Sequence, residues 1–455
     1  IVNQYRETIN KNSNKYLLIG TLDILSGKLE SPSHGMFGMI SCAENGHVVI
    51  IPSDSEIHGA LISKAQKTKI YKADNLSEVW SILLGTKKAI PVKYDPSKIK
   101  IKKHLKYIPN FNSISGVTKA KKSMIVALAG GHNILLVGPP GQGKTMLAKA
   151  ASGVLPNLHQ REMFNVNKIY SARGLLKGDE VILTRPFQEA QNNITEAALL
   201  GGGNPHPQPG LVSLSHNGVL LFDEINLWNP NLIQKLRTVI NDGVIQVQRV
   251  AASYEFPSNF MMVASMNPCK CGWFGHYICP TCQTVFLSQY EKCPSHRNVK
   301  LISKCNCNRT EVRKYKDKLS KPILDRIDLK VLVSPYDKEQ YANTQYSSST
   351  ISKQISAARQ IQNERYKNSN FIYLNSGVPD FSEFFKYNQR LNKETNKYLV
   401  STLKQLDLTK RLEVKLLLVS RTIADLDKSI DIEKKHISDA ISLMGLDSNY
   451  FKQFN

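Results

Sequence analysis

Short, continuous apolar runs alternate with segments of helical spacing between residues 112 and 336. The runs lie at 134–137, 219–222 and 260–264. Strands of a parallel sheet are buried on both faces, and crossover helices connect them, so this alternation is typical of a parallel sheet. We therefore predict an α/β domain over residues 112–336.

The two ends of the chain have different patterns. Residues 1–86 combine strand-like runs with glycine-rich turns and one helical segment, which is typical of a small α+β domain. Beyond Pro335 the chain is polar, and its apolar residues recur at helical spacing, which predicts an all-helical domain over residues 337–455. The expected strands lie at 16–19 and 48–51, and the expected helical stretches at 76–84, 399–408, 412–426 and 437–444.

A lysine-rich stretch over residues 87–111 separates the first domain from the α/β domain. Between Lys87 and Lys106 it holds eight lysines around Pro91 and Pro96, with few large apolar residues. Two roles fit this composition: a solvated tether, or a segment that contacts phosphate groups directly.

Composition narrows the class of protein. The 455 residues suffice for roughly two to four domains, and 41% hydrophobic residues exclude a largely disordered chain. A formal net charge of +23 makes a polyanion such as nucleic acid a reasonable partner. Because no apolar run has membrane-spanning length and Ile1 opens no signal-peptide pattern, we expect a cytoplasmic protein without a membrane partner. The absent initiator methionine leads us to expect a longer natural chain.

A phosphate-binding motif follows the first apolar run. Two glycines, a lysine and a hydroxyl have the P-loop spacing, and the motif stands between a strand-like run and a helical segment, as a P-loop requires. Backbone N–H groups of such a loop converge on phosphate oxygens, while Lys144 reaches the β and γ phosphates and Thr145 binds Mg²⁺. The predicted site for ATP and Mg²⁺ comprises Gly138, Pro139, Pro140, Gly141, Gln142, Gly143, Lys144, Thr145 and Met146.

Polar residues also follow the other two apolar runs. Asp223 and Glu224 come directly after 219–222, and Asn267 follows the third run. A P-loop ATPase needs one carboxylate to hold Mg²⁺ and another to polarise the attacking water. We assign these roles to Asp223 and Glu224, and we expect Asn267 to orient the water or the γ phosphate.

Two arginines are candidates for binding the charge that develops on the γ phosphate. Arg326 lies near the end of the α/β domain, and Arg421 lies in the helical domain. A guanidinium is always charged and its donors suit phosphate oxygens. An ordinary surface or ion-pairing role is the alternative for each.

Seven of the eight cysteines lie between Cys269 and Cys307, which indicates metal binding in a reducing compartment rather than a disulfide framework. Closely spaced pairs of ligands suit tetrahedral Zn²⁺, and eight ligands make two sites. We predict an inner cysteine site of Cys279, Cys282, Cys293 and His296, and an outer cysteine site of Cys269, Cys271, Cys305 and Cys307 at the base of an insertion over 269–307. Four protein ligands leave no open position, so both sites are expected to be structural. His276, a spare ligand, is expected to be an exposed turn residue.

Taken together, these motifs resemble the magnesium-chelatase-like AAA+ ATPases of the YifB/ComM type. The resemblance extends over about residues 15–445 and is carried by 130–148, 214–224, 266–272, 324–329 and 420–426. It implies an AAA+ module with a helical lid, assembled as a homo-oligomeric ring that we expect to be a hexamer. In such a ring ATP lies between subunits, so Arg326 would act in trans as an arginine finger and Arg421 in cis as the lid sensor.

The resemblance also implies an activity. Proteins of the ComM type are associated with branch migration of DNA during natural transformation, so we expect a motor or helicase that acts on single-stranded or branched DNA. Two rivals stay open: a magnesium-chelatase-type ATPase that remodels a protein partner, and a nucleotide-gated scaffold without processive work.

The first domain resembles the later half of the Lon-protease-like, S5-type domain of this family through 19–23 and 25–29. No Lon-type Ser/Lys pair is recognisable, so we expect a packing role and no peptidase activity. Residues 185–193, which we expect to form a loop, depart from the family because they lack a stretch of basic residues and histidines. This weakens a DNA-contacting role if the loop faces the pore or DNA. Residues 201–203, all glycine, fit either a mobile loop or a tight turn.

Overall fold

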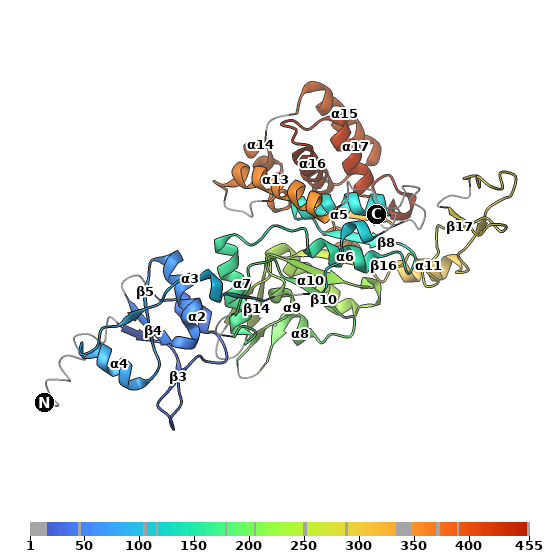
Figure 1. The fold of residues 1–455 in the computed structure, drawn as a ribbon. Coiled ribbons are helices and arrows are strands. Elements are labelled where there is room, and N and C mark those ends of the chain that lie inside the picture. Colours follow the sequence, from blue (N-terminus) through green and yellow to red (C-terminus); the bar gives the residue numbers. More distant parts are fainter. Residues whose placement is uncertain are drawn as a thin grey trace.

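Three domains and one projecting insertion make up the chain (Figure 1). The computed structural model describes residues 16–452 except 44–46, 103–104, 106, 115–116, 178–179, 204–205, 249–252, 287–289, 334–346, 370–373 and 389–390. Ile1, Lys103, Lys106 and Pro335, which entered the sequence analysis, lie outside the described residues. The α/β domain lies at the centre, with the N-terminal domain at one end, the insertion at the other and the helical domain above (Figure 1).

The central sheet has five parallel strands in the order β10-β13-β16-β8-β20. They are β8 (Ile134–Val137), β10 (Phe187–Ala190), β13 (Val219–Phe222), β16 (Met261–Met266) and β20 (Leu329–Leu332). Every residue of β8, β13 and β16 is buried, which explains why these strands are continuous apolar runs in the sequence. The predicted parallel α/β fold is confirmed, although β16 runs two residues beyond the expected end and β10 was expected to be a loop.

The strand register brings three chain segments to one edge of the sheet. Phe222 pairs with Ala264, and Met266 pairs with Val137. Because all these strands are parallel, the residues that follow β8, β13 and β16 share the carboxyl edge. The strand order reverses at β8, and ligands of open α/β sheets bind at the carboxyl edge of such a point.

Helices cover both faces of the sheet. Alternate residues of β8 face opposite cores: Ile134 and Leu136 join a core shared with α5 (Thr118–Gly130) and the helical domain, whereas Leu135 and Val137 join a core shared with α10 (Pro230–Asp242). The helix that follows the first strand is α6 (Lys144–Ser152). Helix α5 therefore packs against both the central sheet and the helical domain.

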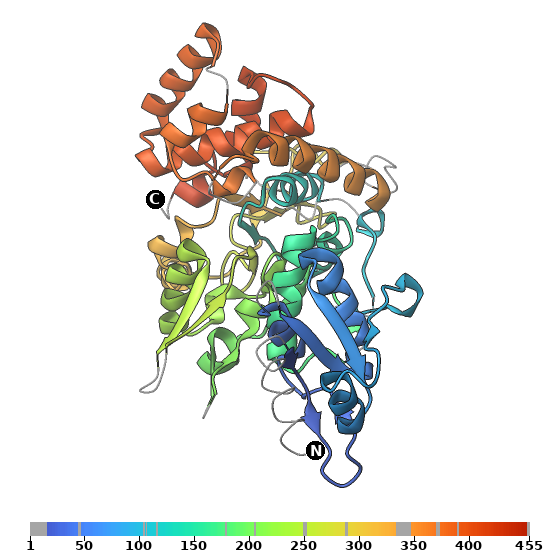
Figure 2. The same ribbon diagram turned by 90° about the vertical axis from the view of Figure 1, so that its left-hand side faces the viewer.

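The helical C-terminal domain is confirmed. Its helices are α13 (Ser348–Tyr366), α14 (Phe381–Tyr387), α15 (Lys393–Leu406), α16 (Lys410–Leu426), α17 (Lys434–Leu443) and α18 (Asn449–Lys452). Figure 2 shows these orange and red helices stacked over α5. Thr422 of α16 and the ring of His132 share a hydrogen bond of 2.8 Å, just before β8 begins. Helix α16 thus meets the amino end of β8, whereas Tyr450 of α18 reaches the Pro268 carbonyl at the carboxyl edge.

The N-terminal domain is a four-stranded sheet with helices, as expected for an α+β domain. The strands β1 (Tyr16–Leu18), β4 (Val48–Pro52) and β5 (Lys69–Ala73) are parallel, and β6 (Ile90–Pro91) joins them antiparallel. The helices are α2 (Met36–Ser41), α3 (Glu56–Gln66) and α4 (Leu76–Leu83), and a hairpin of β2 (Thr21–Leu22) and β3 (Leu29–Glu30) projects from the domain.

The basic segment after this domain is docked in part. β7 (Lys100–Ile101) pairs in parallel with β9 (Glu180–Val181), and Lys102 forms an ion pair of 3.3 Å with Glu180. The residues of β6 and β7 are exposed, but both strands are paired, so this part of the stretch is not a free tether. The domain also rests on α7 (Gln160–Ala172), where the backbone N–H of Gly35 donates to the Ser171 carbonyl at 2.7 Å.

Two loop expectations need correction. Phe187–Ala190 is the edge strand β10, where Glu189 pairs with Lys149 at 2.8 Å, so this stretch does not form a free pore loop. Gly201–Gly202 is strand β11, paired with β12 (Gln208–Pro209). A Cβ on Gly201 would stand 2.8 Å from the Gln208 carbonyl oxygen, so close strand pairing requires glycine there.

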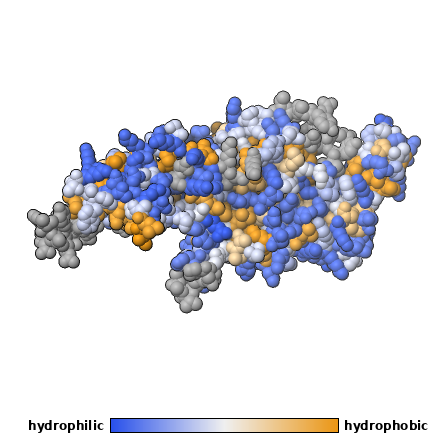
Figure 3. All heavy atoms as spheres, turned by 60° about the horizontal axis from the view of Figure 1, so that its bottom comes forward, coloured by the Kyte–Doolittle hydropathy of each residue, from blue (hydrophilic) through white to orange (hydrophobic). Residues whose placement is uncertain are grey.

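Within the described ranges, no helix has the length and apolar character to cross a membrane. Figure 3 shows hydrophobic residues interspersed with hydrophilic ones on the face in view.

Candidate functional site

The P-loop connects β8 directly to α6. Gly141 and Gly143 have φ values of 76° and 72°, a left-handed conformation that glycine adopts without strain. The N–H of Gly138 donates to the Met266 carbonyl at 3.2 Å, which fixes the start of the loop on the neighbouring strand. The loop therefore has the backbone form in which N–H groups and a helix N-terminus receive phosphate oxygens.

Lys144 folds back over the loop. Its Nζ donates to the carbonyl oxygens of Gly138 at 2.6 Å and Pro139 at 2.8 Å, and to Asn267 Oδ1 at 3.1 Å. Burial lowers the pKa of Lys144 to about 8, although Asp223 and Glu224 act in the opposite direction. The ammonium is held by neutral oxygens only, so an anionic ligand can replace them.

Asp223 lies beside the P-loop hydroxyl. Thr145 Oγ1 donates to Asp223 Oδ2 at 2.9 Å, and the Ser265 hydroxyl donates to the other carboxylate oxygen. The indole N–H of Trp228 donates to the Asp223 backbone carbonyl at 3.1 Å. Oxygen ligands of this kind suit Mg²⁺. The structure thus brings together the two residues assigned to the metal.

Glu224 has an unusual backbone conformation. Its φ is 48°, its N–H donates to Ser265 Oγ at 3.3 Å, and its side chain is exposed. A left-handed residue other than glycine is uncommon and stores strain, and such residues gather at functional sites. The conformation leaves this carboxylate open to water beside the phosphate loop.

Ser265 is a residue of the candidate site that sequence reasoning missed. It bonds both acidic residues of the site, yet a serine at the end of an apolar run has no distinctive spacing. Only the register of the strands indicates the role of Ser265 in the site. Phe222 pairs with Ala264, so Asp223 and Ser265, which come next in the chain, lie opposite each other.

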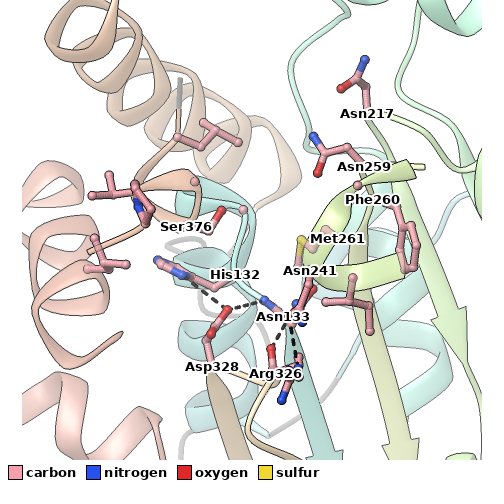
Figure 4. A pocket seen from close by; sticks show the side chains of 18 of the residues that line it. His132, Asn133, Asn217, Asn241, Asn259, Phe260, Met261, Arg326, Asp328 and Ser376 are labelled. Carbon is pink, nitrogen blue, oxygen red and sulfur yellow. Dashed lines mark hydrogen bonds and ion pairs between the residues drawn. The ribbon is translucent and has the colours of Figure 1, made fainter. Parts of the chain in front are cut away.

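Arg326 lies at the amino edge of the sheet (Figure 4). Its guanidinium donates to Asn241 Oδ1 at 3.2 Å and to the Pro322 carbonyl at 3.0 Å. Burial, together with the charges of Arg411 and Arg237, lowers the pKa of Arg326. The structure does not bring Arg326 to its own P-loop, which lies at the opposite edge of the sheet.

A cavity of about 1680 Å³ lies at this amino edge, between the α/β domain and the helical domain. Asp328 stands on its wall, where it accepts the Asn133 N–H at 2.9 Å (Figure 4). It also pairs with Lys415 of α16 at 2.5 Å. Burial would raise the pKa of Asp328, but Lys415 and His132 outweigh it and hold that pKa well below its ordinary value. The cationic side chains on the wall are Arg161, Arg185, Arg326, Arg359, Lys367, Lys410, Arg411 and Lys415.

Arg421 is held inside the helical domain. It is 3% exposed, donates to Asp425 Oδ1 at 3.0 Å, and reaches the carbonyls of Ser429 and Ile430 at 2.5 and 2.7 Å. The next residue, Thr422, contacts His132 at the amino end of β8. The geometry of one chain therefore does not support the expected action of Arg421 in cis on the P-loop.

The eight insertion ligands form the two expected groups, and within each group the ligand atoms lie within 4.8 Å of one another. An ideal tetrahedron with Zn–S bonds of about 2.3 Å has sulfur atoms about 3.8 Å apart. In the outer cysteine site the Sγ atoms of Cys269, Cys271 and Cys305 are 3.3, 3.5 and 3.7 Å apart. In the inner cysteine site, Sγ of Cys279 and of Cys293 each lie 3.8 Å from His296 Nδ1. Both groups have the spacing and donor chemistry that suit Zn²⁺.

His276 is buried, so the expectation of an exposed turn residue is wrong. Its ring packs edge-on against Trp273, with 5.9 Å between centroids, and Nδ1 lies 3.1 Å from the Phe274 carbonyl oxygen. The ammonium of Lys304 covers the Trp273 ring at 3.2 Å. This packing places His276 among structural residues at the base of the insertion.

Two family models match most of the chain beyond the N-terminal domain. The model described as magnesium chelatase, subunit ChlI, matches residues 110–292 and 276–341, and the model of the ChlI C-terminal region matches residues 345–444.

Similar proteins match over much of the chain. The protein YifB of Escherichia coli K12, described as uncharacterized, is 31% identical over 443 residues, which cover 97% of this chain and 79% of YifB. The competence protein ComM of Haemophilus influenzae is 30% identical over 423 residues, 92% of this chain and 75% of ComM. A 38 kDa magnesium-chelatase subunit of Cereibacter sphaeroides is 25% identical over 174 residues, 35% of this chain and 52% of that subunit.

Proposed function

Because the chain belongs to the magnesium-chelatase-like YifB/ComM family of AAA+ proteins, we propose that it is a cytoplasmic, ATP-hydrolysing ring motor that acts on DNA. One observation carries the ATPase part. Lys144, Thr145, Asp223 and Asn267, which come from three segments of the chain, meet at the carboxyl edge of the sheet.

Each of these residues has a defined task. The N–H groups from Gly141 to Thr145 and the start of α6 receive the phosphates, and Lys144 exchanges its neutral oxygen partners for phosphate oxygens. Thr145 and Asp223 would hold Mg²⁺, which neutralises phosphate charge when bound. Glu224 accepts a proton from the attacking water, and Asn267 orients that water.

We propose that the ring places Arg326 at the nucleotide of a neighbouring subunit. The position of Arg326 opposite its own P-loop supports this, because head-to-tail subunits of a ring join opposite faces. Mixing two inactive variants, Lys144→Ala and Arg326→Ala, tests the idea. In mixed rings about one interface in four joins an intact P-loop to an intact arginine, so part of the activity should return. No recovery in mixtures shown by native mass spectrometry to be mixed rings would contradict action in trans.

We propose that Zn²⁺ fills both cysteine sites and folds the insertion. Four thiolate or imidazole ligands in each group support a closed structural site. The small strands β17 (Tyr277–Ile278), β18 (Val285–Phe286) and β19 (Ile302–Ser303) give the insertion only a small core of its own. The N-terminal domain, which we regard as a partial Lon-like, S5-type domain, has a packing role, supported by its docking on α7.

The DNA part of the proposal is supported by the net charge of +23 and by similarity to a protein named for competence. The exposed cations Lys292, Arg297 and Lys300 of the insertion are candidate phosphate contacts. A rival function, remodelling of a protein partner, is favoured by the similarity to magnesium-chelatase subunits.

Steady-state ATP hydrolysis of the full chain, with and without single-stranded, duplex and four-way-junction DNA at fixed salt, separates the two. Lys144→Ala is the blank. We expect turnover that depends on Lys144 and rises severalfold with single-stranded or branched DNA. Lys144-dependent turnover that ignores every DNA would exclude the DNA motor and favour a protein partner. Absence of Lys144-dependent turnover would exclude the ATPase itself.

A further inference from the structure

The outer cysteine site lies directly beside the nucleotide site. Cys269 follows Asn267 by two residues, and Asn267 Oδ1 accepts a hydrogen bond of 3.1 Å from Lys144. On the other side of the ligand pair, Gly272 lies against the P-loop: a Cβ there would stand 2.7 Å from Cδ of Pro140. One short segment thus contacts the phosphate loop at both of its ends.

The same segment is fixed from behind. The N–H of Phe274 donates to Cys269 Sγ at 3.2 Å, and the hydroxyl of Tyr450 donates to the Pro268 carbonyl at 3.2 Å. The ammonium of Lys316 covers the rings of Tyr450 and Phe274 at 3.8 and 4.7 Å. These contacts hold the back of the segment, while Cys305 and Cys307 approach from the far end of the insertion.

The inner cysteine site has different surroundings. Cys279 and Cys293 are buried in a small core with Phe286 and Leu301, all within the insertion. This part of the chain projects away from the α/β domain (Figure 1). The inner cysteine site therefore serves as a natural control, since it has the same donor chemistry without the contact with the P-loop.

We propose that a zinc-class cation in the outer cysteine site is a positioning element of the ATPase: by closing the segment from Cys269 to Gly272 it holds Asn267 and Pro140 in the form that binds nucleotide. The inference rests on the proposed ATP site. The cation joins Cys305 and Cys307 to the segment, so its removal takes away this tie, lets the segment open and moves Asn267 away from Lys144. The inner cysteine site has no such effect.

Two double variants of the full chain test this. Cys305→Ser with Cys307→Ser removes the outer ligands that lie farthest along the chain from Asn267, and Cys282→Ser with Cys293→Ser removes two inner ligands. Mass spectrometry of metal content should show that each variant loses about one zinc per chain. The Kd for a fluorescent ATP analogue should rise about tenfold in the outer variant and stay unchanged in the inner variant. Equal Kd values in both, with one zinc lost from each, would overturn the proposal.

A second measurement does not depend on the folding of the outer variant. Coupling between two ligands is reciprocal, so ATP must retain zinc as strongly as zinc retains ATP. In the inner variant only the outer cysteine site holds zinc, and equilibrium competition with a colorimetric chelator measures the Kd of this zinc. Saturating ATP should lower this Kd about tenfold. The added substitution Lys144→Ala should abolish the change in the zinc Kd.

The outcomes separate the two proposals. A zinc Kd that does not change with ATP, in a protein that binds the analogue through Lys144, would overturn the coupling and leave the ATPase standing. Failure of wild-type protein to bind the analogue would instead overturn the proposed function.

Discussion

The two edges of the central sheet use similar side chains for different purposes. At the carboxyl edge Lys144 is held by two backbone carbonyls and an amide oxygen, all neutral. At the amino edge Lys415 pairs with the buried Asp328, so its charge is already neutralised. A buried lysine whose hydrogen-bond partners are all neutral can exchange them for an anion, whereas a buried lysine in an ion pair joins two domains.

Substitution of Glu224 at the carboxyl edge should have the largest effect on ATP turnover. Glu224→Gln keeps the size of the side chain but removes the base, so ATP turnover should fall by up to about 10⁴-fold while nucleotide stays bound. Single-turnover hydrolysis and analogue binding measure the two quantities. Glu189→Gln, a change on the edge strand of the same sheet, is the control and should leave turnover nearly unchanged. A Glu224→Gln protein that hydrolyses ATP normally would show that another residue activates the water.

The same substitution at both edges sharpens the comparison. Lys415→Met leaves the Asp328 charge buried without its partner and should lower the free energy of unfolding by about 3–5 kcal/mol. Lys144→Met removes an ammonium that burial disfavours, so it should leave the thermal midpoint unchanged or raise it while abolishing ATP binding.

Lys410→Met is the matched control on α16. Lys410 is exposed and paired with Glu413 at 3.1 Å, so its loss should change stability by about 0–1 kcal/mol. Differential scanning calorimetry measures all three variants. Equal destabilisation by Lys415→Met and Lys144→Met would refute the distinction between the two edges.

A smaller, pH-dependent effect should appear at the carboxyl edge. Burial lowers the pKa of Lys144 to about 8, and bound phosphate stabilises the ammonium form and raises that pKa. Above pH 8, ATP binding therefore takes up a proton, and affinity should fall by up to about tenfold per pH unit. Calorimetry at about pH 9 in buffers of different ionisation enthalpy measures the uptake. An affinity that is constant from pH 7 to about 9.5 would contradict it.

The strands and motifs at the carboxyl edge could be predicted because each has a local signature. β8 and β13 are unbroken apolar runs, and the P-loop spacing is set by phosphate geometry. The close pairs of insertion ligands were equally local, since the two members of each pair stand within one turn of each other.

What could not be predicted depends on contacts between distant segments. β10 is partly polar because it lies at the sheet edge, so it lacks the buried-strand pattern. His276 is buried under Trp273 and Lys304, and no periodicity in the sequence predicts this contact. The position of Arg421 follows from the docking of α16 on α5. This tertiary contact places Arg421 near the amino end of β8 and not near its carboxyl end, and no local pattern in the sequence indicates which end it will be.

The short pairing of β7 with β9 has a mechanical consequence. A domain on a flexible tether does not follow the motion of its neighbour. The N-terminal domain is instead held at this strand pair and at Ser171 of α7, so it turns with the α/β domain. A rotation of α7 would therefore carry the N-terminal domain with it and move the far end of that domain through the larger distance. That end carries the β2–β3 hairpin, whose tip residues Ile24 and Leu25 are almost fully exposed.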